Sequence, residues 1–272
     1  MRQQRDIPWG LMLTCVVVVA GLLGWFLWRP EPSPLPEPLA NKAPPTDDAV
    51  RSGPQYPISA PVAADETERR LQPLPALDSS DEYFKLDVAG VFGQELADFM
   101  VSSSLIERIV ASVDSLPGPQ LAERIRPFDA LPGPLAVAGQ DGTGEYVLLS
   151  DNYDRYKVFV EELVSADLQQ AADVYRRYYP LFQKSYVGLG YPDAYFNDRL
   201  VEVIDHLLAT PDVSEPVMLV RPHVMYQFAD NKLESLSSGQ KLMIRIGPAH
   251  RARIKETLRQ FRAMVANEEG QQ

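Results

Sequence analysis

The chain has 272 residues, a net charge of −11 and a single cysteine. The acidic charge argues against nucleic acid as a ligand, because a nucleic-acid binder needs a basic surface to displace counterions from phosphate. One cysteine excludes an internal disulfide framework and any zinc site built on cysteines. The composition divides the chain into an apolar run at 7–28, a stretch at 30–75 that holds 12 of the 24 prolines, and a remainder with the composition of a folded domain.

The first region, Ile7 to Trp28, contains no charged residue. As a helix it is long enough to cross a hydrocarbon core of ~30 Å, and tryptophans lie near both of its ends, where indole favours the membrane interface. It is longer than the apolar core of a secretory signal peptide and lacks a small-residue cleavage site. We therefore expect an uncleaved transmembrane anchor in a lipid bilayer, preceded by a short tail at 1–6.

The charges that flank this segment predict its orientation. Arg2 and Arg5 precede it, whereas Arg29 follows it together with Glu31 and Glu37. Cytoplasmic flanks carry the excess of positive charge. The sequence therefore predicts a cytoplasmic N-terminus and an extracytoplasmic C-terminal domain.

Residues 29–75 are expected to form a disordered, proline-rich linker. Proline occupies every second position from Pro30 to Pro38, which favours polyproline II because proline fixes φ and has no N–H to donate. The rest of the stretch is polar and interrupted by proline. It cannot bury enough apolar area to offset the entropy of ordering, so we expect a spacer that holds the domain away from the membrane.

Residues 76–267 are expected to form one domain of class α+β, mainly α, followed by a disordered tail at 268–272. Capping-box patterns at Ser79–Glu82 and Ser104–Glu107 predict the starts of two helices. Apolar periodicity predicts further helices at 152–164, 167–188, 193–209, 238–246 and 248–265.

Proline and glycine interrupt these patterns. Pro180 is expected to kink or divide the helix at 167–188. Apolar runs on both sides of the glycine-rich stretch 139–144 predict a β-hairpin. Loose alternation over Val217–Phe228 indicates another strand, which Pro222 would confine to an edge or a bulge.

Three stretches carry a resemblance to a known family: YYPLFQKSYVGLGYPDAYFNDRLVEVIDHLLATP from Tyr178 onward, then LVRPHVMYQFAD, then LESLSSGQKLMIRIGP. They resemble bacterial proteins grouped as domain of unknown function 3014, over residues 76–265. That family brings no established activity, ligand or catalytic residue. The resemblance implies a discrete domain in the same plan of anchor, spacer and domain, so the membrane would be the bacterial inner membrane and the domain would be periplasmic.

An aromatic cluster at 175–196 is the first candidate site. Its rings could stack on an envelope glycan or a protein partner, and their alternative role is core packing with hydroxyl groups at the surface. The candidate binding residues here are Tyr178, Tyr179, Tyr186 and Tyr191.

The helix expected at 193–209 supplies further candidates, with Asp193 and Arg199 near its start. Asn197 falls at the edge of the apolar face, where a buried amide needs hydrogen-bond partners, and we expect it to tie this helix to the 217–228 segment. Asp198, Glu202 and His206 follow a four-residue spacing that could bind a divalent metal, although a solvated polar face explains the same spacing.

The last helix is basic within an acidic domain. Arg251 and Arg253 could meet an acidic partner or anionic lipid, or could pair with carboxylates of the domain itself. The usual catalytic and cofactor motifs are missing, so we expect no cofactor. Two hypotheses remain: a non-enzymatic interaction or scaffold protein, and a cell-envelope enzyme or glycan-binding module that uses the polar and aromatic cluster.

The predicted topology can be tested with reporter fusions. Alkaline phosphatase fused after Gln272 should be active, because the enzyme folds only outside the cytoplasm. A fusion that is active only as a cytoplasmic reporter would reverse the topology.

Overall fold

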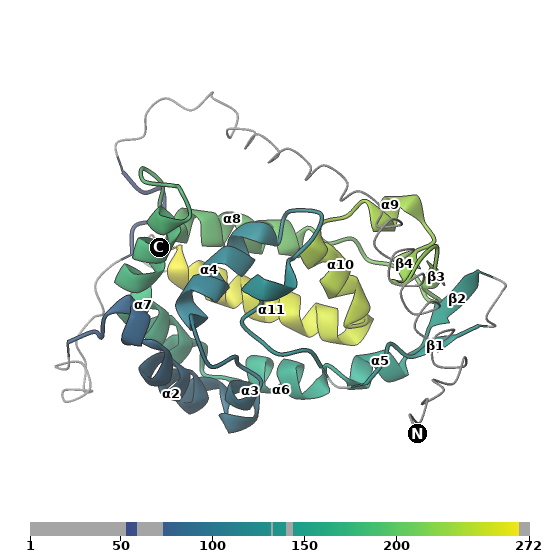
Figure 1. The fold of residues 1–272 in the computed structure, drawn as a ribbon, viewed down its shortest axis with the longest axis horizontal. Coiled ribbons are helices and arrows are strands. Elements are labelled where there is room, and N and C mark those ends of the chain that lie inside the picture. Colours follow the sequence, from purple (N-terminus) through teal and green to yellow (C-terminus); the bar gives the residue numbers. More distant parts are fainter. Residues whose placement is uncertain (1–52, 59–72, 132, 140–143, 267–272) are drawn as a thin grey trace, which may run out of the picture. The chain divides into compact units, whose positions relative to one another are not determined.

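The computed structural model describes residues 53–58, 73–131, 133–139 and 144–266. Most of them are helical, and the strands gather at one end of the fold (Figure 1). The helical elements are η1 (Leu77–Ser79), α2 (Asp81–Phe92), α3 (Gln94–Asp98), α4 (Leu105–Ser115), η2 (Glu123–Ile125), α5 (Asp151–Asp154), α6 (Lys157–Ser165), α7 (Leu168–Gly188), α8 (Phe196–Leu208), α9 (Asn231–Glu234), α10 (Ser238–Arg245) and α11 (Pro248–Val265). The strands are β1 (Val137–Ala138), β2 (Glu145–Leu148), β3 (Met218–Val220) and β4 (Gln227–Phe228).

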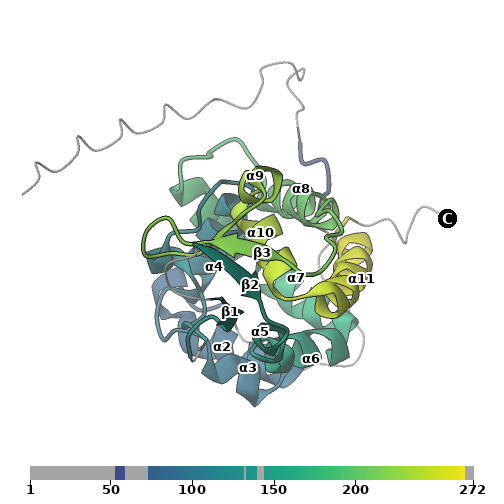
Figure 2. The same cartoon turned by 90° about the vertical axis from the view of Figure 1, so that its right-hand side faces the viewer.

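The strands form one antiparallel sheet in the order β1-β2-β3-β4. The hairpin of β1 and β2 confirms the prediction around 139–144. The other half of the sheet comes from much later in the chain, since Tyr146 of β2 pairs with Leu219 of β3. One face of the sheet is buried together with Ile244 of α10. Figure 2 views the fold from the side of the sheet, with the helices behind it.

The prediction of a single strand over Val217–Phe228 is wrong, because this stretch forms β3 and β4 with a loop at 221–226 between them. Pro222 lies in that loop, where it removes no hydrogen bond from the ladder. The Arg221 side chain crosses the loop, donating from Nε to the Val224 carbonyl at 3.2 Å and lying over the Tyr226 ring at 5.2 Å. Loose alternation alone does not distinguish a hairpin from one longer strand.

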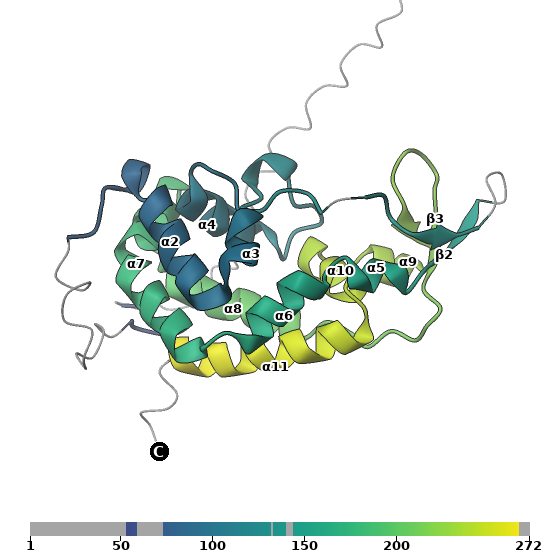
Figure 3. The same ribbon diagram turned by 90° about the horizontal axis from the view of Figure 1, so that it is seen from below.

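The main core lies among α2, α4, α7, α8 and the end of α11. The helix α7 supplies much of it. Its Phe182 ring stacks on Phe196 of α8 with centroids 5.5 Å apart, and its Tyr178 ring meets Phe84 of α2 edge-on at 5.0 Å. Each such pair contributes about 0.5–1.5 kcal/mol beyond the area it buries. Figure 3 shows α6 beside α11, which closes this side of the helical layer.

Two interruptions of the helices differ from expectation. Pro180 does not divide α7, which is continuous over Leu168–Gly188. Proline removes one helical hydrogen bond, but aromatic residues buried before and after it, Tyr178 and Phe182, hold both halves against the same core. Conversely, the helix expected at 152–164 is two helices, α5 and α6, separated at Arg155 and Tyr156.

Neither capping box forms as predicted. The helix α2 begins at Asp81 after Ser80, and the hydroxyl of Ser104 makes no cap for α4. Instead, the Asp81 carboxylate accepts hydrogen bonds from the Ser104 and Leu105 N–H groups at 2.8 and 2.7 Å. An acceptor from another helix thus satisfies N–H groups that an isolated helix leaves without partners. These two hydrogen bonds join α2 to the start of α4.

The predicted anchor at 7–28, the tail at 1–6 and the C-terminal tail at 268–272 lie outside the described residues. Among the residues that the structure describes, no helix combines the length and the apolar character that a membrane span requires.

The expectation of a linker without structure does not hold for residues 53–58, which pack against the domain. Tyr56 and Ile58 contact the main core. These two apolar side chains stand between prolines in an otherwise polar stretch, and their burial supplies the free energy that polar neighbours lack. Leu74 also contacts the core, so the domain begins slightly before residue 76.

The Asp81 cap can be measured through stability. Asp81→Ala should lower the free energy of unfolding by about 1–2 kcal/mol, because two N–H groups lose a charged acceptor. Urea denaturation followed by circular dichroism provides the measurement. The control is Asp78→Ala, which alters an exposed carboxylate in η1 and should change stability by less than about 0.5 kcal/mol. Equal effects of the two substitutions would contradict the cap.

Candidate peptide-binding site

The site is built at the start of α8, where α7 fixes the chain. Tyr195, the residue before the helix, supplies no side-chain cap. Gln183 of α7 takes that role: its Oε1 accepts from the Phe196 N–H at 2.8 Å, and its Nε2 donates to the Ala194 carbonyl at 2.8 Å. A side chain with both a donor and an acceptor therefore sets the position at which Asn197 and Asp198 begin the helix.

Asn197 is fully buried and joins four parts of the chain. Its Oδ1 accepts from the Tyr175 hydroxyl of α7 at 3.0 Å, and its Nδ2 donates to the Val265 carbonyl of α11 at 2.9 Å and to the Tyr56 carbonyl at 2.8 Å. Burial raises the pKa of Tyr175 well above its ordinary value, with the charges of Tyr179 and Asp198 acting in the same direction. Tyr175 thus stays protonated as a donor at neutral pH.

Asp198 holds the backbone of residues 53–58. Its two carboxylate oxygens accept from the Gln55 N–H at 2.9 Å and the Tyr56 N–H at 2.8 Å. Hydrogen bonds to an ionised acceptor are roughly twice as strong as neutral ones. With Asn197, the site therefore binds two successive N–H groups and one carbonyl of a short segment that bends at Gln55 and Tyr56, and all of these groups belong to the backbone.

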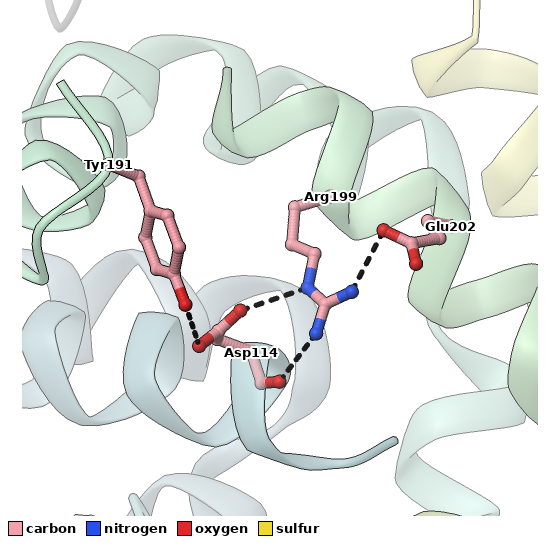
Figure 4. Close-up of polar contacts among 4 residues, drawn as sticks. All are labelled: Asp114, Tyr191, Arg199 and Glu202. Carbon is pink, nitrogen blue, oxygen red and sulfur yellow. Dashed lines mark hydrogen bonds and ion pairs between the residues drawn. The ribbon is translucent and has the colours of Figure 1, made fainter. Parts of the chain in front are cut away.

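An ion-pair network braces the other side of α8 (Figure 4). Arg199 donates from Nε to the Asp114 carboxylate at 2.9 Å, from Nη2 to the Asp114 carbonyl at 2.8 Å and from Nη1 to Glu202 at 2.8 Å. Tyr191 donates to the same Asp114 carboxylate at 3.3 Å. Although burial acts to lower the pKa of Arg199, the hydrogen bond to Glu202 and the charges of Glu202 and Asp114 raise it overall. Arg199 therefore positions α8 on α4.

The three residues considered as metal ligands have separate partners. Asp198 binds the 53–58 backbone, Glu202 pairs with Arg199, and Nε2 of His206 lies 2.8 Å from the Ser237 hydroxyl at the start of α10. Within the described part of the chain, no group of three or more His, Cys, Asp or Glu side chains is arranged to hold a metal ion. Their four-residue spacing places them on one helix, but Asp198 and His206 contact two different parts of the chain and Glu202 pairs within α8.

The tyrosines of the aromatic cluster belong largely to the core. Tyr178 is fully buried and donates its hydroxyl to Asp87 at 2.9 Å. The buried Tyr186 ring stacks on the half-buried Tyr191 at 4.7 Å, and burial raises the pKa of Tyr186 to about 12, with the Asp114 charge adding to the effect. Tyr179 is half-buried and donates to Gln183 at 3.2 Å. In this conformation the rings contact one another, and their role in binding stays a prediction.

The remaining candidates lie elsewhere. Asp193 is exposed in the turn before α8. Arg251 is buried 3.5 Å from Asp212, and Arg253 makes two bonds to Glu161 of α6 at 2.6 and 2.9 Å. These arginines are about 20 Å along α11 from its contact with Asn197, at ~1.5 Å per residue. They pair with carboxylates of the domain, which is one of the two roles expected for them.

Two features of the site differ from the sequence expectation. Asn197 does form the predicted network, but its partners are Tyr175, Val265 and Tyr56 rather than the 217–228 segment. Sequence reasoning missed Tyr56 and Ile58 altogether because their surroundings have the composition of a linker. The available signal was the pair of apolar residues placed next to prolines.

The buried amide can be tested by an isosteric change. Asn197→Asp places an acceptor where the Nδ2 group donates to two carbonyls, so the free energy of unfolding should fall by at least about 2 kcal/mol. Urea denaturation measures it, and Asn231→Asp, the same substitution at an exposed position in α9, is the control. An Asn197→Asp protein as stable as the control would refute the network.

Comparison with known proteins identifies the family of this chain but assigns no activity to it. No curated protein and no solved structure matches this chain. Residues 105–262 match a family described as a protein of unknown function, DUF3014. The match spans α4 to α11, and so includes Asn197, Asp198 and the helices that position them. Because it covers more than half of the chain, this protein belongs to the DUF3014 family.

Proposed function

We propose that this protein is a single-pass inner-membrane protein whose extracytoplasmic helical domain binds short peptide segments of a protein partner at Asn197 and Asp198. The anchor is the segment at 7–28, with the N-terminus in the cytoplasm and the domain in the periplasm. In this role the domain acts as an interaction or scaffold module and holds its partner near the membrane.

The observation that supports this function is the way in which the domain holds residues 53–58. Asp198 and Asn197 bind the segment through two N–H groups and one carbonyl. Binding of backbone groups, combined with contacts to a few side chains, is a recurring feature of peptide recognition. A site of this kind can accept a segment of another protein that has the same backbone conformation.

The membrane part of the proposal is supported by the sequence of 7–28, which has no charge, and by the basic residues that precede it. A tether raises the local concentration of the domain near partners at the same membrane. Weak peptide binding is then sufficient for association, which suits a site that buries only a short segment.

Photo-crosslinking in the cell tests the function. A photoreactive phenylalanine in place of Tyr195, which is exposed just before Asn197, should crosslink to one recurring segment of a partner, identified by mass spectrometry. Asp198→Asn in the same chain should reduce this product at least about tenfold, because an amide offers one acceptor and turns a donor toward an N–H.

Two controls make the outcome specific. Asp205→Asn alters another carboxylate of α8, which pairs with Arg262, and should leave the crosslink unchanged. The photoreactive residue at Tyr83, an exposed position on α2, should not capture the same segment. A product that forms equally with Asp198→Asn, or that involves only residues 53–58 of this chain, would overturn the function.

A further inference from the structure

We infer that residues 53–58 are a built-in competitor of this site, and that its ligand in trans is a short peptide in which an aromatic residue is followed by proline and then by an apolar residue. This ligand class rests on the proposed function and adds to it both the chemistry of the partner and the regulation of the site.

The first requirement on the ligand comes from Asp198. Its two oxygens accept from two successive N–H groups, those of Gln55 and Tyr56. Proline has no N–H, so neither of these positions can be proline. The neighbouring positions carry no such demand, and both are proline, at Pro54 and Pro57. The occupant places its prolines at the positions where the site needs no donor.

The second requirement is a restricted backbone, in a segment that bends at Gln55 and Tyr56. A residue that precedes proline is restricted to β and polyproline II conformations. Pro57 imposes this restriction on Tyr56, the residue whose N–H and carbonyl both bind the site. Part of the ordering entropy is therefore removed before binding, which raises affinity without any added contact.

The third requirement comes from the side chains. Tyr56 and Ile58 are half-buried and pack against the main core. The Tyr56 hydroxyl also accepts a hydrogen bond from Nε2 of Gln55 at 2.9 Å. An aromatic ring with a polar tip can thus enter the apolar contact while its hydroxyl stays satisfied. The ring and the apolar side chain supply the selectivity that backbone bonds lack.

Charge narrows the class further. The site presents the Asp198 carboxylate, and the domain from residue 76 onward has a net charge of −10, since it holds 19 Lys and Arg against 29 Asp and Glu. An acidic side chain beside the two bound N–H groups would be repelled. The occupant has Gln55 there and carries no charge over 53–58.

Covalent connection makes residues 53–58 a strong competitor. The stretch 59–72 joins them to Leu74, which itself packs on the core. A connection of this length gives an effective concentration on the order of millimolar. A partner peptide must displace the segment. Its apparent Kd is therefore its intrinsic Kd divided by the fraction of sites that residues 53–58 leave open.

Binding of a labelled peptide tests both parts. The probe is a fluorescent peptide with the sequence of residues 51–60, RSGPQYPISA, and the proteins are the full chain in detergent micelles and a variant in which a Gly/Ser hexapeptide replaces residues 53–58. By fluorescence anisotropy the variant should bind the peptide at least about tenfold more tightly than the unaltered chain.

A methylated probe and a second variant identify the contact. Methylation of the tyrosine amide nitrogen in the peptide removes one donor to Asp198 and should weaken binding about tenfold or more. Asp198→Asn in the Gly/Ser variant should do the same, whereas Asp205→Asn should not. Equal binding to the Gly/Ser variant and the unaltered chain would overturn the competitor role and leave the peptide-binding function standing. No binding to either protein would overturn both, as would binding that ignores methylation.

Discussion

Asn197 has no exposure to water, so its amide must find its hydrogen-bond partners inside the protein. The partners come from α7, α11 and residues 53–58, through Tyr175, Val265 and Tyr56. An amide is suited to this position because it offers an acceptor to a hydroxyl and two donors to carbonyls. The helix α8 therefore reaches its packed position only when the end of α11 and the Tyr175 side chain are correctly positioned as well.

A second recurring contact among the described residues is a carboxylate that accepts hydrogen bonds from backbone N–H groups. Asp81 and Asp198 each accept two successive N–H groups from a distant part of the chain. The N–H groups bound by Asp81 open α4, which is integral to the core, so that contact is structural. Those bound by Asp198 belong to a short segment outside the helical layer. We propose that the same chemistry there holds an occupant that another peptide replaces.

The sequence predicts the helices and the first hairpin well, because their burial follows simple periodicities, as in α4 and α11. It fails where a distant residue decides the outcome. Asp81, rather than Ser104, caps α4, and Phe182 keeps α7 continuous through Pro180. At the site, the amphipathic pattern singled out Asn197, but no local rule could name its partners. Tyr56 lies over a hundred residues away, in a stretch with the composition of a linker.

Asp198 holds residues 53–58 on the domain through their backbone. Amide hydrogen exchange on the full chain, read at Gln55 and Tyr56, tests this contact directly. Both amides should be protected in the unaltered protein. Asp198→Asn should remove this protection, while the amides of α7 stay protected. Exchange of Gln55 and Tyr56 at the rate of an unstructured peptide, with or without Asp198, would contradict it.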